Sequence, residues 1–215
     1  MTAIVQQCPL CLQSSGISPF YSNKSREFYR CTHCALIFVP PSYFLSPLQE
    51  KAEYDKHQNS PNDPGYRTFL SKLFQPMQER ITPGSKGLDF GSGPGPTLSI
   101  MFEEQGHEMH IYDPFYAPDR DVLKIEYDFV CASEVVEHFH KPATDLSLLW
   151  SLVKTGGYLG IMTGMAQDAE AFAKWRYKDD LSHVSFFSVQ TMEWLAGEWQ
   201  AGLHLMGNNV SLFRK

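Results

Sequence analysis

Three glycines at alternate positions follow a short apolar segment near the middle of the chain. Residues 86–90 read as a buried strand, and Gly91, Gly93 and Gly95 come directly after it, before an apolar helical pattern. Glycines at a sharp strand-to-helix turn present backbone N–H groups and let a ligand approach the backbone closely. Asp89 precedes the first glycine, where a carboxylate can reach a cationic or hydroxylated ligand. The pattern predicts a ligand-binding turn, although an ordinary Gly/Pro loop would give the same residues.

The spacing of these glycines is G-x-G-x-G, which differs from the G-x-G-x-x-G of dinucleotide-binding proteins. Further along, residues 108–112 read as a second strand, which ends at Asp113. The glycine loop and this acid together resemble the start of the class I S-adenosylmethionine-dependent methyltransferases. In that family the loop surrounds the methionine part of the cofactor, and the acid binds the ribose hydroxyls. The resemblance implies a cofactor site formed by Asp89, Gly91, Gly93, Gly95, Asp113 and Pro114.

A second motif strengthens the resemblance. Residues 127–132 read as a buried strand that leads into Ser133-Glu-Val-Val-Glu-His138. The same family has a Glu-hydrophobic-hydrophobic-Glu-His turn beside the cofactor. The resemblance therefore implies that Ser133 and Glu134 contact the cofactor, and that Glu137 and His138 lie near the pocket mouth. His138 is a candidate catalytic residue, or it braces the turn.

The segment after Asp113 departs from the family pattern. Only 14 residues, 114–127, lead from this acid to the start of the next clear strand. The family usually fits a helix, a third strand and an adenine-contacting acid into this interval. Two prolines and a charged run leave little room for a helix here. The adenine-contacting residue is therefore left unassigned.

Four cysteines near the N-terminus form two C-x2-C pairs. Cys8 and Cys11 make the first pair, Cys31 and Cys34 make the second, and 19 residues separate the pairs. Four thiolates in two such knuckles match tetrahedral zinc coordination, and they leave no position open for water. Forty residues with few large aliphatic side chains also need a metal to fold. We predict a structural Zn²⁺ in a zinc ribbon, and four unrelated free cysteines are the alternative.

The segment between the ribbon and the glycine loop has helical character. In the resembling family, helices at this place often cover the active site, so His57, Asn59, Asp63 and Tyr66 are candidates for a lid. Of these, Tyr66 is predicted to bind substrate. The alternative is a solvated loop with a packing tyrosine.

An aromatic and basic segment follows the last predicted parallel strand. Trp175 and Tyr177 lie in it, and His183 comes shortly after, followed by further aromatic residues. In the resembling enzymes, a histidine followed by aromatics at this place approaches the substrate pocket. Trp175 and Tyr177 are therefore predicted to bind substrate. His183 is a candidate general base, since a neutral imidazole can accept a proton from a hydroxyl or an activated carbon. The aromatic residues could instead pack the edge of the sheet.

The predicted fold class is α/β, with a small zinc ribbon before the larger domain. The ribbon spans residues 1–40, a helical connector or lid spans residues 41–82, and a methyltransferase domain spans residues 83–215. The resemblance, which covers residues 84–165 best, implies a doubly wound, Rossmann-like sheet. Residues 203–213 read as a C-terminal antiparallel hairpin with a Gly/Asn turn.

Charge bears on the methyl acceptor. The net charge is −6, and residues 83–215 carry ten Lys and Arg against 18 acids. A protein that holds long nucleic acid usually has a basic surface, so the sequence favours a small-molecule acceptor and O- or C-methylation. Ubiquinone-biosynthesis O-methyltransferases and sugar C-methyltransferases are similar through the core. The alternatives are a ribosomal or transfer RNA methyltransferase that uses its ribbon to bind RNA, and a non-catalytic S-adenosylmethionine-binding protein.

The N-terminal residues lack the basic and apolar regions of a signal peptide. No apolar run reaches the ~20 residues of a membrane span. The sequence therefore predicts a cytoplasmic protein without a membrane partner. In such a compartment the five cysteines are expected as thiols or metal ligands rather than disulfides.

Overall fold

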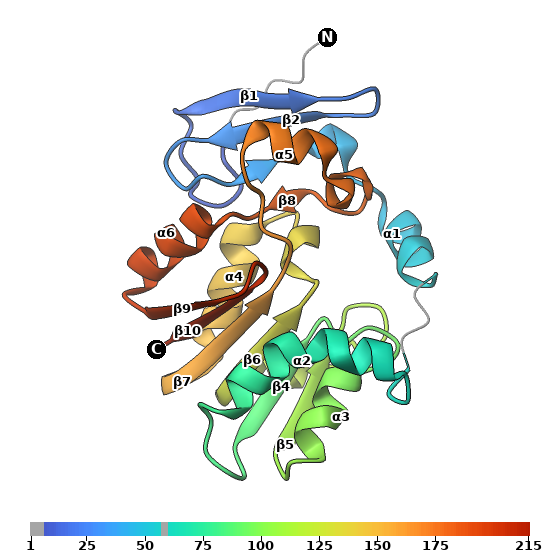
Figure 1. Cartoon of the computed structure of the whole chain (residues 1–215), viewed down its shortest axis with the longest axis vertical. Coiled ribbons are helices and arrows are strands. Elements are labelled where there is room, and N and C mark those ends of the chain that lie inside the picture. The colour runs from blue at the N-terminus through green and yellow to red at the C-terminus, as the bar shows by residue number, and fades with distance from the viewer. Residues whose placement is uncertain (1–6, 57–59) are drawn as a thin grey trace.

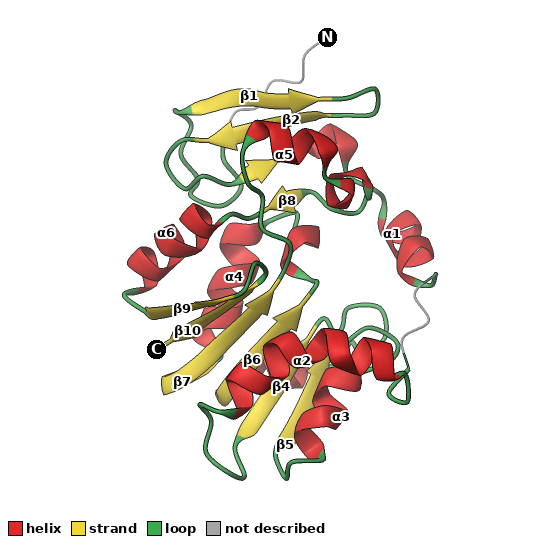
Figure 2. Ribbon diagram, in the orientation of Figure 1, coloured by secondary structure: helices red, strands yellow, loops and turns green. Residues whose placement is uncertain are grey.

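Two β-sheets organise the fold in the computed structural model, which describes residues 7–56 and 60–215. One sheet has six strands and the other has four. Figure 1 shows the four-stranded sheet at the N-terminal end of the molecule and the six-stranded sheet in its lower half. Figure 2 shows helices on both faces of the larger sheet. The predicted α/β class and doubly wound sheet are confirmed.

The six-stranded sheet is parallel except for its last two strands. In spatial order the strands are β5 (Glu108–Tyr112), β4 (Lys86–Phe90), β6 (Tyr127–Ser133), β7 (Val153–Met162), β10 (Val210–Arg214) and β9 (Gly202–Met206). β9 and β10 pair antiparallel around a turn that contains Gly207, whose φ is 57°. β4 and β6 are buried on both faces, as expected for inner parallel strands. The predicted C-terminal hairpin is thus present.

Helices cover both faces of this sheet. The helices on one face are α2 (Pro64–Gln78) and α3 (Thr97–Glu103), and those on the other are α4 (Pro142–Ser151) and α6 (Val189–Trp199). α2 presents Leu70, Leu73 and Met77 to the sheet at helical spacing. The Asp63 carboxylate accepts hydrogen bonds from the backbone N–H groups of Gly65 and Tyr66. These bonds fix the N-terminus of the helix.

β5 forms one edge of the large sheet. Between β5 and β6 the chain forms a short bridge from Asp113 to Ala117 and then a 3₁₀ turn, η2 (Arg120–Lys124). Within the described residues, no further strand pairs with β5. The short segment after Asp113 therefore leaves out the helix and strand of the resembling family, as its length predicted.

The four-stranded sheet combines both ends of the chain. Its strands are β1 (Ile17–Ser22), β2 (Glu27–Cys31), β3 (Ile37–Phe38) and β8 (Ser185–Phe186). β8 pairs antiparallel with β3, although about 150 residues separate them in the chain. Phe28, Phe172 and Phe186 pack edge-to-face at this junction. The segment predicted as a ribbon is thus completed by a strand from the C-terminal part.

Short elements occur in the connections between these strands. They are η1 (Pro41–Tyr43), α1 (Pro47–Tyr54), η3 (Val136–His138), α5 (Ala169–Lys174) and η4 (Arg176–Asp179). A capping box between Ser46 and Gln49 begins α1, which lies beside the gap between the two sheets (Figure 1). The lid candidates His57 and Asn59 fall outside the described residues. Across the described chain, no helix combines the length and apolarity needed to cross a bilayer.

Candidate active site and metal centre

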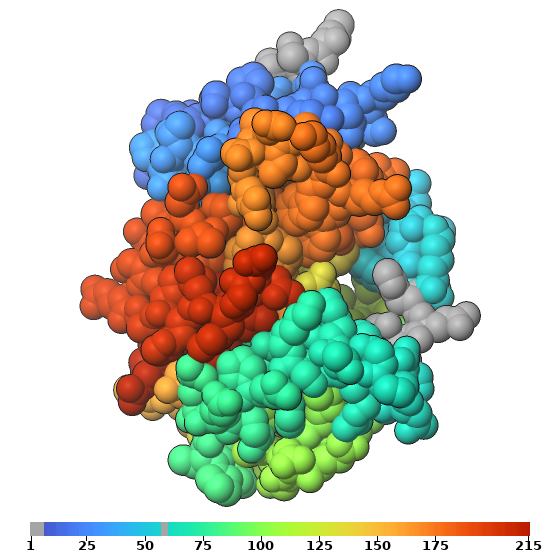
Figure 3. Space-filling view, in the orientation of Figure 1, coloured from blue at the N-terminus to red at the C-terminus, as the bar shows by residue number. Residues whose placement is uncertain are grey.

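A cavity of about 780 Å³ opens at the carboxyl ends of β4, β5 and β6. In open α/β sheets this edge is where ligands bind. The cavity is lined by β-strand ends, by the glycine loop, by α1 and by residues before β8. Figure 3 shows the surface hollowed between the parts of the chain that contain α1 and α2. The volume is in the range of a cofactor and small-molecule site.

The glycine loop folds against the end of β5. Gly91 has a φ of +77°, and a Cβ added there would lie 2.3 Å from Val135 Cγ2. Gly93 has a φ of +63°, and a Cβ there would meet nothing within 4 Å. The N–H groups of Gly91 and Ser92 both donate to the carbonyl of Tyr112. These amides are therefore used within the protein, in contrast to the expectation that the loop presents free N–H groups, and the loop offers its glycine backbone to the cavity.

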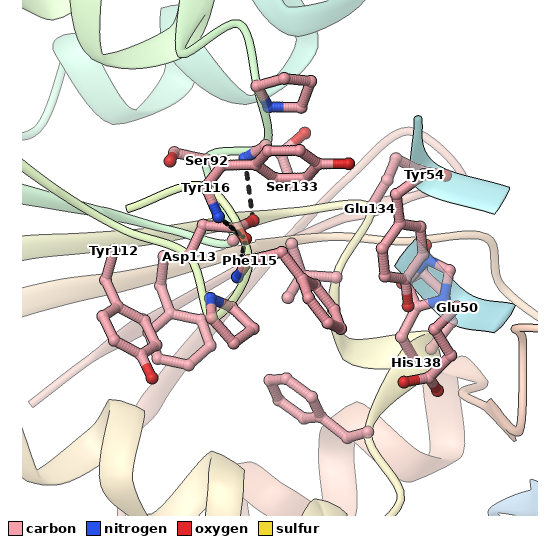
Figure 4. Close-up of a pocket in the computed structure, with 18 of the residues that line it drawn as sticks. Glu50, Tyr54, Ser92, Tyr112, Asp113, Phe115, Tyr116, Ser133, Glu134 and His138 are labelled. Atoms are coloured by element: carbon pink, nitrogen blue, oxygen red, sulfur yellow. Dashed lines mark hydrogen bonds between the residues drawn. The ribbon is translucent and has the colours of Figure 1, made fainter. Parts of the chain in front are cut away.

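Asp113 ties the glycine loop to the turn after β5. Its Oδ2 accepts from the Gly93 N–H at 3.0 Å, and its Oδ1 accepts from the N–H groups of Phe115 at 2.8 Å and Tyr116 at 3.1 Å. Figure 4 shows these bonds, with the carboxylate facing the space between the loop and α1. A carboxylate has about four acceptor positions, so about one remains for a ligand hydroxyl.

Two buried carboxyls meet a tyrosine hydroxyl after β6. The Tyr177 hydroxyl lies 2.5 Å from Glu137 Oε1 and 3.1 Å from Glu134 Oε2, and Thr163 donates to the other oxygen of Glu137 at 2.8 Å. One tyrosine proton cannot serve two carboxylates, so the group holds an additional proton. Burial, followed by the charge of Glu137, raises the pKa of Glu134 to about 8. Glu134 also has a φ of 52°, an uncommon backbone conformation at this position in the cavity wall.

Two histidines line the cavity with their Nδ1 atoms anchored. His138 Nδ1 lies 3.1 Å from the Ser182 carbonyl, and His183 Nδ1 lies 2.8 Å from the Tyr177 carbonyl. A carbonyl only accepts, so each neutral ring carries its proton on Nδ1 and a lone pair on Nε2. Burial, followed by the neighbouring His138, lowers the pKa of His183. His183 is therefore expected to be neutral and able to accept a proton at neutral pH.

α1 forms a wall of the cavity that the sequence analysis did not assign. Tyr54 packs edge-to-face on His138 with ring centroids 5.1 Å apart, and Glu50 Oε1 lies 2.8 Å from His140 Nε2. Burial raises the pKa of Tyr54. Figure 4 shows Glu50 and Tyr54 across the cavity from Asp113. The i, i+4 spacing of Glu50 and Tyr54 puts both side chains on one face of the helix, and this spacing could have indicated from the sequence that they share a site.

The structure brings most of the predicted site residues to the cavity. Those that line it are Tyr66, Gly91, Gly93, Asp113, Pro114, Ser133, Glu134, His138 and His183. Asp89, Gly95, Trp175 and Tyr177 do not line it. Asp89 is buried in β4, and burial raises its pKa to about 7. Trp175 stacks on the Tyr177 ring, whose hydroxyl reaches the cavity carboxyls from behind. The contacts of all these residues with cofactor or substrate stay predictions.

The four N-terminal cysteines converge. Their sulfur atoms all lie within 4.8 Å of one another, and two of the pairs, Cys8 with Cys34 and Cys11 with Cys31, are 3.5 Å apart. Sulfurs around a tetrahedral zinc with ~2.3 Å bonds would be about 3.8 Å apart, so the arrangement fits Zn²⁺. All four are free thiols. The cluster is compatible with the predicted structural zinc ribbon.

A second group in the cavity wall also has metal-ligand chemistry. One ligand atom from each of Glu137, His138 and His183 lies within 4.8 Å of the other two. Two imidazoles and a carboxylate can hold a divalent cation, and the same three groups can instead move a proton. The sequence analysis placed two of these residues near the pocket mouth but did not join them to His183.

The charge of the cavity is one-sided. Its lining contains six carboxyl residues and, among the described residues, no lysine or arginine. The carboxyl residues are Glu50, Asp113, Glu134, Glu137, Asp145 and Asp180. Aromatic rings of Tyr54, Tyr66, Phe69 and Phe115 also line the space. Such a cavity favours cationic or neutral ligands and disfavours anions.

The sheet order, the glycine loop and the cavity at the strand ends define a class I methyltransferase fold. The profile of the methyltransferase domain family matches residues 57–206, and the chain belongs to this family. It is an enzyme, an S-adenosylmethionine-dependent methyltransferase. A search of curated proteins finds no significant match to this sequence.

Solved structures share the fold. A 1,6-didemethyltoxoflavin-N1-methyltransferase from Burkholderia thailandensis, with 1,6-didemethyltoxoflavin and S-adenosylhomocysteine bound, superposes with a TM-score of 0.54. It is 14% identical over 91% of this chain and 96% of that chain. An S-adenosylmethionine-dependent methyltransferase from Archaeoglobus fulgidus has a TM-score of 0.57 and 15% identity over 77% of this chain and 99% of its own. At these identities the likeness concerns the fold.

Proposed function

We propose that the enzyme methylates a small neutral or cationic molecule. The observation that carries this proposal is the cavity lining, with six carboxyl residues and no lysine or arginine among the described residues. An anionic acceptor such as a nucleic acid strand would be repelled at this surface. A hydroxyl, an amine or an activated carbon on an uncharged or positively charged molecule would be tolerated.

S-adenosylmethionine is placed between the glycine loop and Asp113. The amino-acid end would lie along Gly91 and Gly93, which line the cavity, and a Cβ at Gly93 would meet nothing within 4 Å. The ribose hydroxyls would donate to the remaining acceptor position of Asp113. Pro114, Ser133 and Glu134 line the same space, whereas Asp89 and Gly95 lie outside the lining. The sulfonium charge would face the Glu134 side of the cavity.

The reaction requires alignment and the removal of a proton. Bound S-adenosylmethionine supplies a methyl group on a positively charged sulfur. The acceptor atom attacks the methyl carbon in line, and the electrons of the carbon–sulfur bond leave with sulfur as S-adenosylhomocysteine. Where the acceptor is a hydroxyl, its proton would pass to Nε2 of His183 or His138, whose Nδ1 atoms are held by backbone carbonyls. Positioning and exclusion of water would supply much of the rate.

The first test is binding of S-adenosylmethionine and S-adenosylhomocysteine by calorimetry. We expect both to bind, and Asp113→Ala to weaken binding far more than Asp119→Ala, an exposed residue in the same segment. If the wild type bound neither compound, the proposed cofactor site at the glycine loop and Asp113 would be rejected, and a scaffold role would be favoured.

The acceptor class is tested with a panel of small hydroxyl, amine and carbon acceptors beside transfer and ribosomal RNA. Product is followed as transfer of a labelled methyl group. We expect turnover with neutral or cationic small molecules and none with RNA at any salt concentration. Salt-dependent RNA binding with methyl transfer to RNA would replace this proposal by the RNA alternative.

We also propose a cytoplasmic location, which suits free thiols, and cell fractionation tests it.

A further inference from the structure

Arg26 is the largest of the fully buried side chains, and it lies in the turn between β1 and β2 of the small sheet. Only 2% of it is exposed. The Asn23 side chain accepts from the Arg26 N–H at 2.9 Å, which fixes the turn. The Arg26 guanidinium lies 5.3 Å from the centre of the Phe28 ring. Burial lowers the pKa of Arg26, and the nearby carboxylates of Asp180 and Asp179 partly offset this, although within the described residues neither forms an ion pair with it.

Four backbone carbonyls accept hydrogen bonds from the Arg26 guanidinium. Nη1 of Arg26 donates to the carbonyls of His183 at 2.8 Å and Leu181 at 3.3 Å, and Nη2 donates to those of Lys178 and Asp180. All four carbonyls belong to one segment, residues 178–183, which we name the histidine loop. Carbonyls that converge on one point repel one another unless a donor lies between them. The planar fork of arginine offers enough N–H groups for all four, whereas lysine has three donors on one atom.

The histidine loop forms part of the cavity wall. Asp180 and His183 line the cavity, and the Ser182 carbonyl accepts from Nδ1 of His138. The carbonyls that bind Arg26 are therefore close in the chain to the carbonyls of Tyr177 and Ser182, which orient the two histidines. The loop also runs directly into β8, which pairs with β3 of the small sheet. Displacement of the loop backbone would therefore change the orientation of both imidazole rings, His138 and His183.

We propose that Arg26 is a positioning residue for the methyl-transfer site. The guanidinium holds the histidine loop so that His138 and His183 face the acceptor, and the cysteine-bearing sheet that carries Arg26 supports the active site. This inference rests on the proposed role of the two histidines. It gives the small sheet a task within catalysis, in place of recognition of a separate partner.

The test uses Arg26→Lys and Arg26→Met, with Arg30→Met as the matched control. Arg30 lies in β2 of the same sheet and bonds to the exposed Gln190 side chain. The readout is the titration of the His183 imidazole by ¹⁵N NMR, beside the affinity for S-adenosylhomocysteine. The groups that face His183 are Glu137 and His138 from η3 and Asp180 from its own loop.

We expect both Arg26 variants to raise the pKa of His183, because a released loop admits water to a buried imidazole. The affinity for S-adenosylhomocysteine should stay within about twofold, since the glycine loop and Asp113 are on another wall. With an acceptor that turns over, kcat should fall about 100-fold at an unchanged KM for S-adenosylmethionine. Arg30→Met should leave all three unchanged.

An unchanged His183 titration in folded Arg26 variants would overturn the proposal. So would a loss of S-adenosylhomocysteine binding as large as the loss of turnover, because Arg26 would then support the whole fold. Should both variants fail to fold, the wild type decides: restrained Nη groups rotate slowly and give separate proton signals, and averaged signals would reject the clamp. Failure of the wild type to bind S-adenosylhomocysteine would contradict the proposed function and leave the link between Arg26 and His183 measurable.

Discussion

The two sheets are built in different ways. The six-stranded sheet is formed by strands between residues 86 and 214, and buried aliphatic and aromatic side chains cover both of its faces. The four-stranded sheet has two strands of only two residues, and it takes one of them from the C-terminal part. One face of the large sheet has a core of its own, and the other face shares a core with the small sheet. The small sheet depends in addition on a metal-type cysteine cluster and on residues from the C-terminal part.

The difference indicates what the small sheet does. A self-contained ribbon would face outward as a recognition module. Here Leu10 packs into the same cluster as residues of the large sheet, and Arg26 and Phe28 contact segments next to the cavity. The predicted division after residue 40 separates the chain in sequence order, but Arg26, which precedes it, binds the histidine loop of the cavity wall.

Removal of zinc should have the largest effect, and it should affect one sheet. Structural zinc contributes about 10 kcal/mol or more to small metal domains, which is comparable to the whole stability of a domain. We expect a strong chelator or Cys34→Ala to abolish hydrogen-exchange protection in β1, β2, β3 and β8. Amides of β4 and β6 should remain protected.

Cys131→Ala is the control for the cysteine change, because Cys131 is buried in the large sheet and lies outside the cysteine cluster. If hydrogen-exchange protection were lost in both sheets at once, the two sheets would form one cooperative unit, and the contrast drawn between them would be wrong. Metal analysis of the purified protein should find zinc.

Gly91→Ala should damage the site on the large sheet and leave the small sheet intact. The new Cβ would lie 2.3 Å from Val135 Cγ2, in a backbone with a φ of +77°. We expect affinity for S-adenosylhomocysteine to fall about 100-fold, equivalent to about 2.7 kcal/mol. Zinc content should not change.

Gly84→Ala separates backbone strain from the clash. Its φ is +73°, yet a Cβ there meets nothing within 4 Å. This variant should cost about 1–2 kcal/mol of stability and no affinity. Adding Val135→Ala to Gly91→Ala should recover part of the binding, and equal loss in the single and double variants would reject the steric explanation.

Asp113→Asn should have a moderate effect. The amide keeps the shape of the side chain but has one acceptor oxygen, so it cannot serve the N–H groups of Gly93, Phe115 and Tyr116 together. We expect about tenfold weaker binding of S-adenosylhomocysteine by calorimetry, or about 1.4 kcal/mol. Asp119→Asn should bind as the wild type does, and identical affinities for the two variants would argue against a ligand contact at Asp113.

Glu134→Gln should have the smallest effect. It changes the hydrogen bond between Glu134, which follows β6 of the large sheet, and the Tyr177 hydroxyl. The pKa of Glu134 is raised to about 8 in the folded protein, above its ordinary value of 4.5. The folded state therefore holds a proton that the unfolded state releases, and this stabilisation is lost as pH rises from about 4.5 through 8. We expect the melting temperature of the wild type to fall more between pH 5 and pH 9 than that of Glu134→Gln. Exposed Glu193→Gln should follow the wild type, and parallel profiles for all three would exclude a shared proton at Glu134.

Local patterns predicted much of the large sheet and of the metal centre. β5 spans residues 108–112 and β4 spans residues 86–90, as the apolar runs indicated. The spacing of the cysteines brought four sulfurs together, and the short segment after Asp113 left out a strand. These features depend on neighbours in the chain, where periodicity, turn residues and segment length carry the information.

Contacts across the chain were not readable in the same way. The sequence analysis identified Glu134, Glu137 and Tyr177 separately, but their shared hydrogen-bond group joins residues some 40 positions apart. It took Trp175 as a cavity residue, whereas the ring stacks on Tyr177 outside the lining. The contribution of α1 to the cavity also depends on how the connector crosses between the sheets.

The sequence alone determined a metal-type ribbon, a parallel α/β core and a cofactor loop, because each has a local signature in residue type and spacing. The tertiary structure alone decided that β8 completes the ribbon and that Arg26 gathers four carbonyls of the histidine loop. A buried arginine that binds backbone carbonyls leaves no periodic pattern in the sequence. Its role depends on the carbonyl positions, and these exist only once both ends of the chain have folded together.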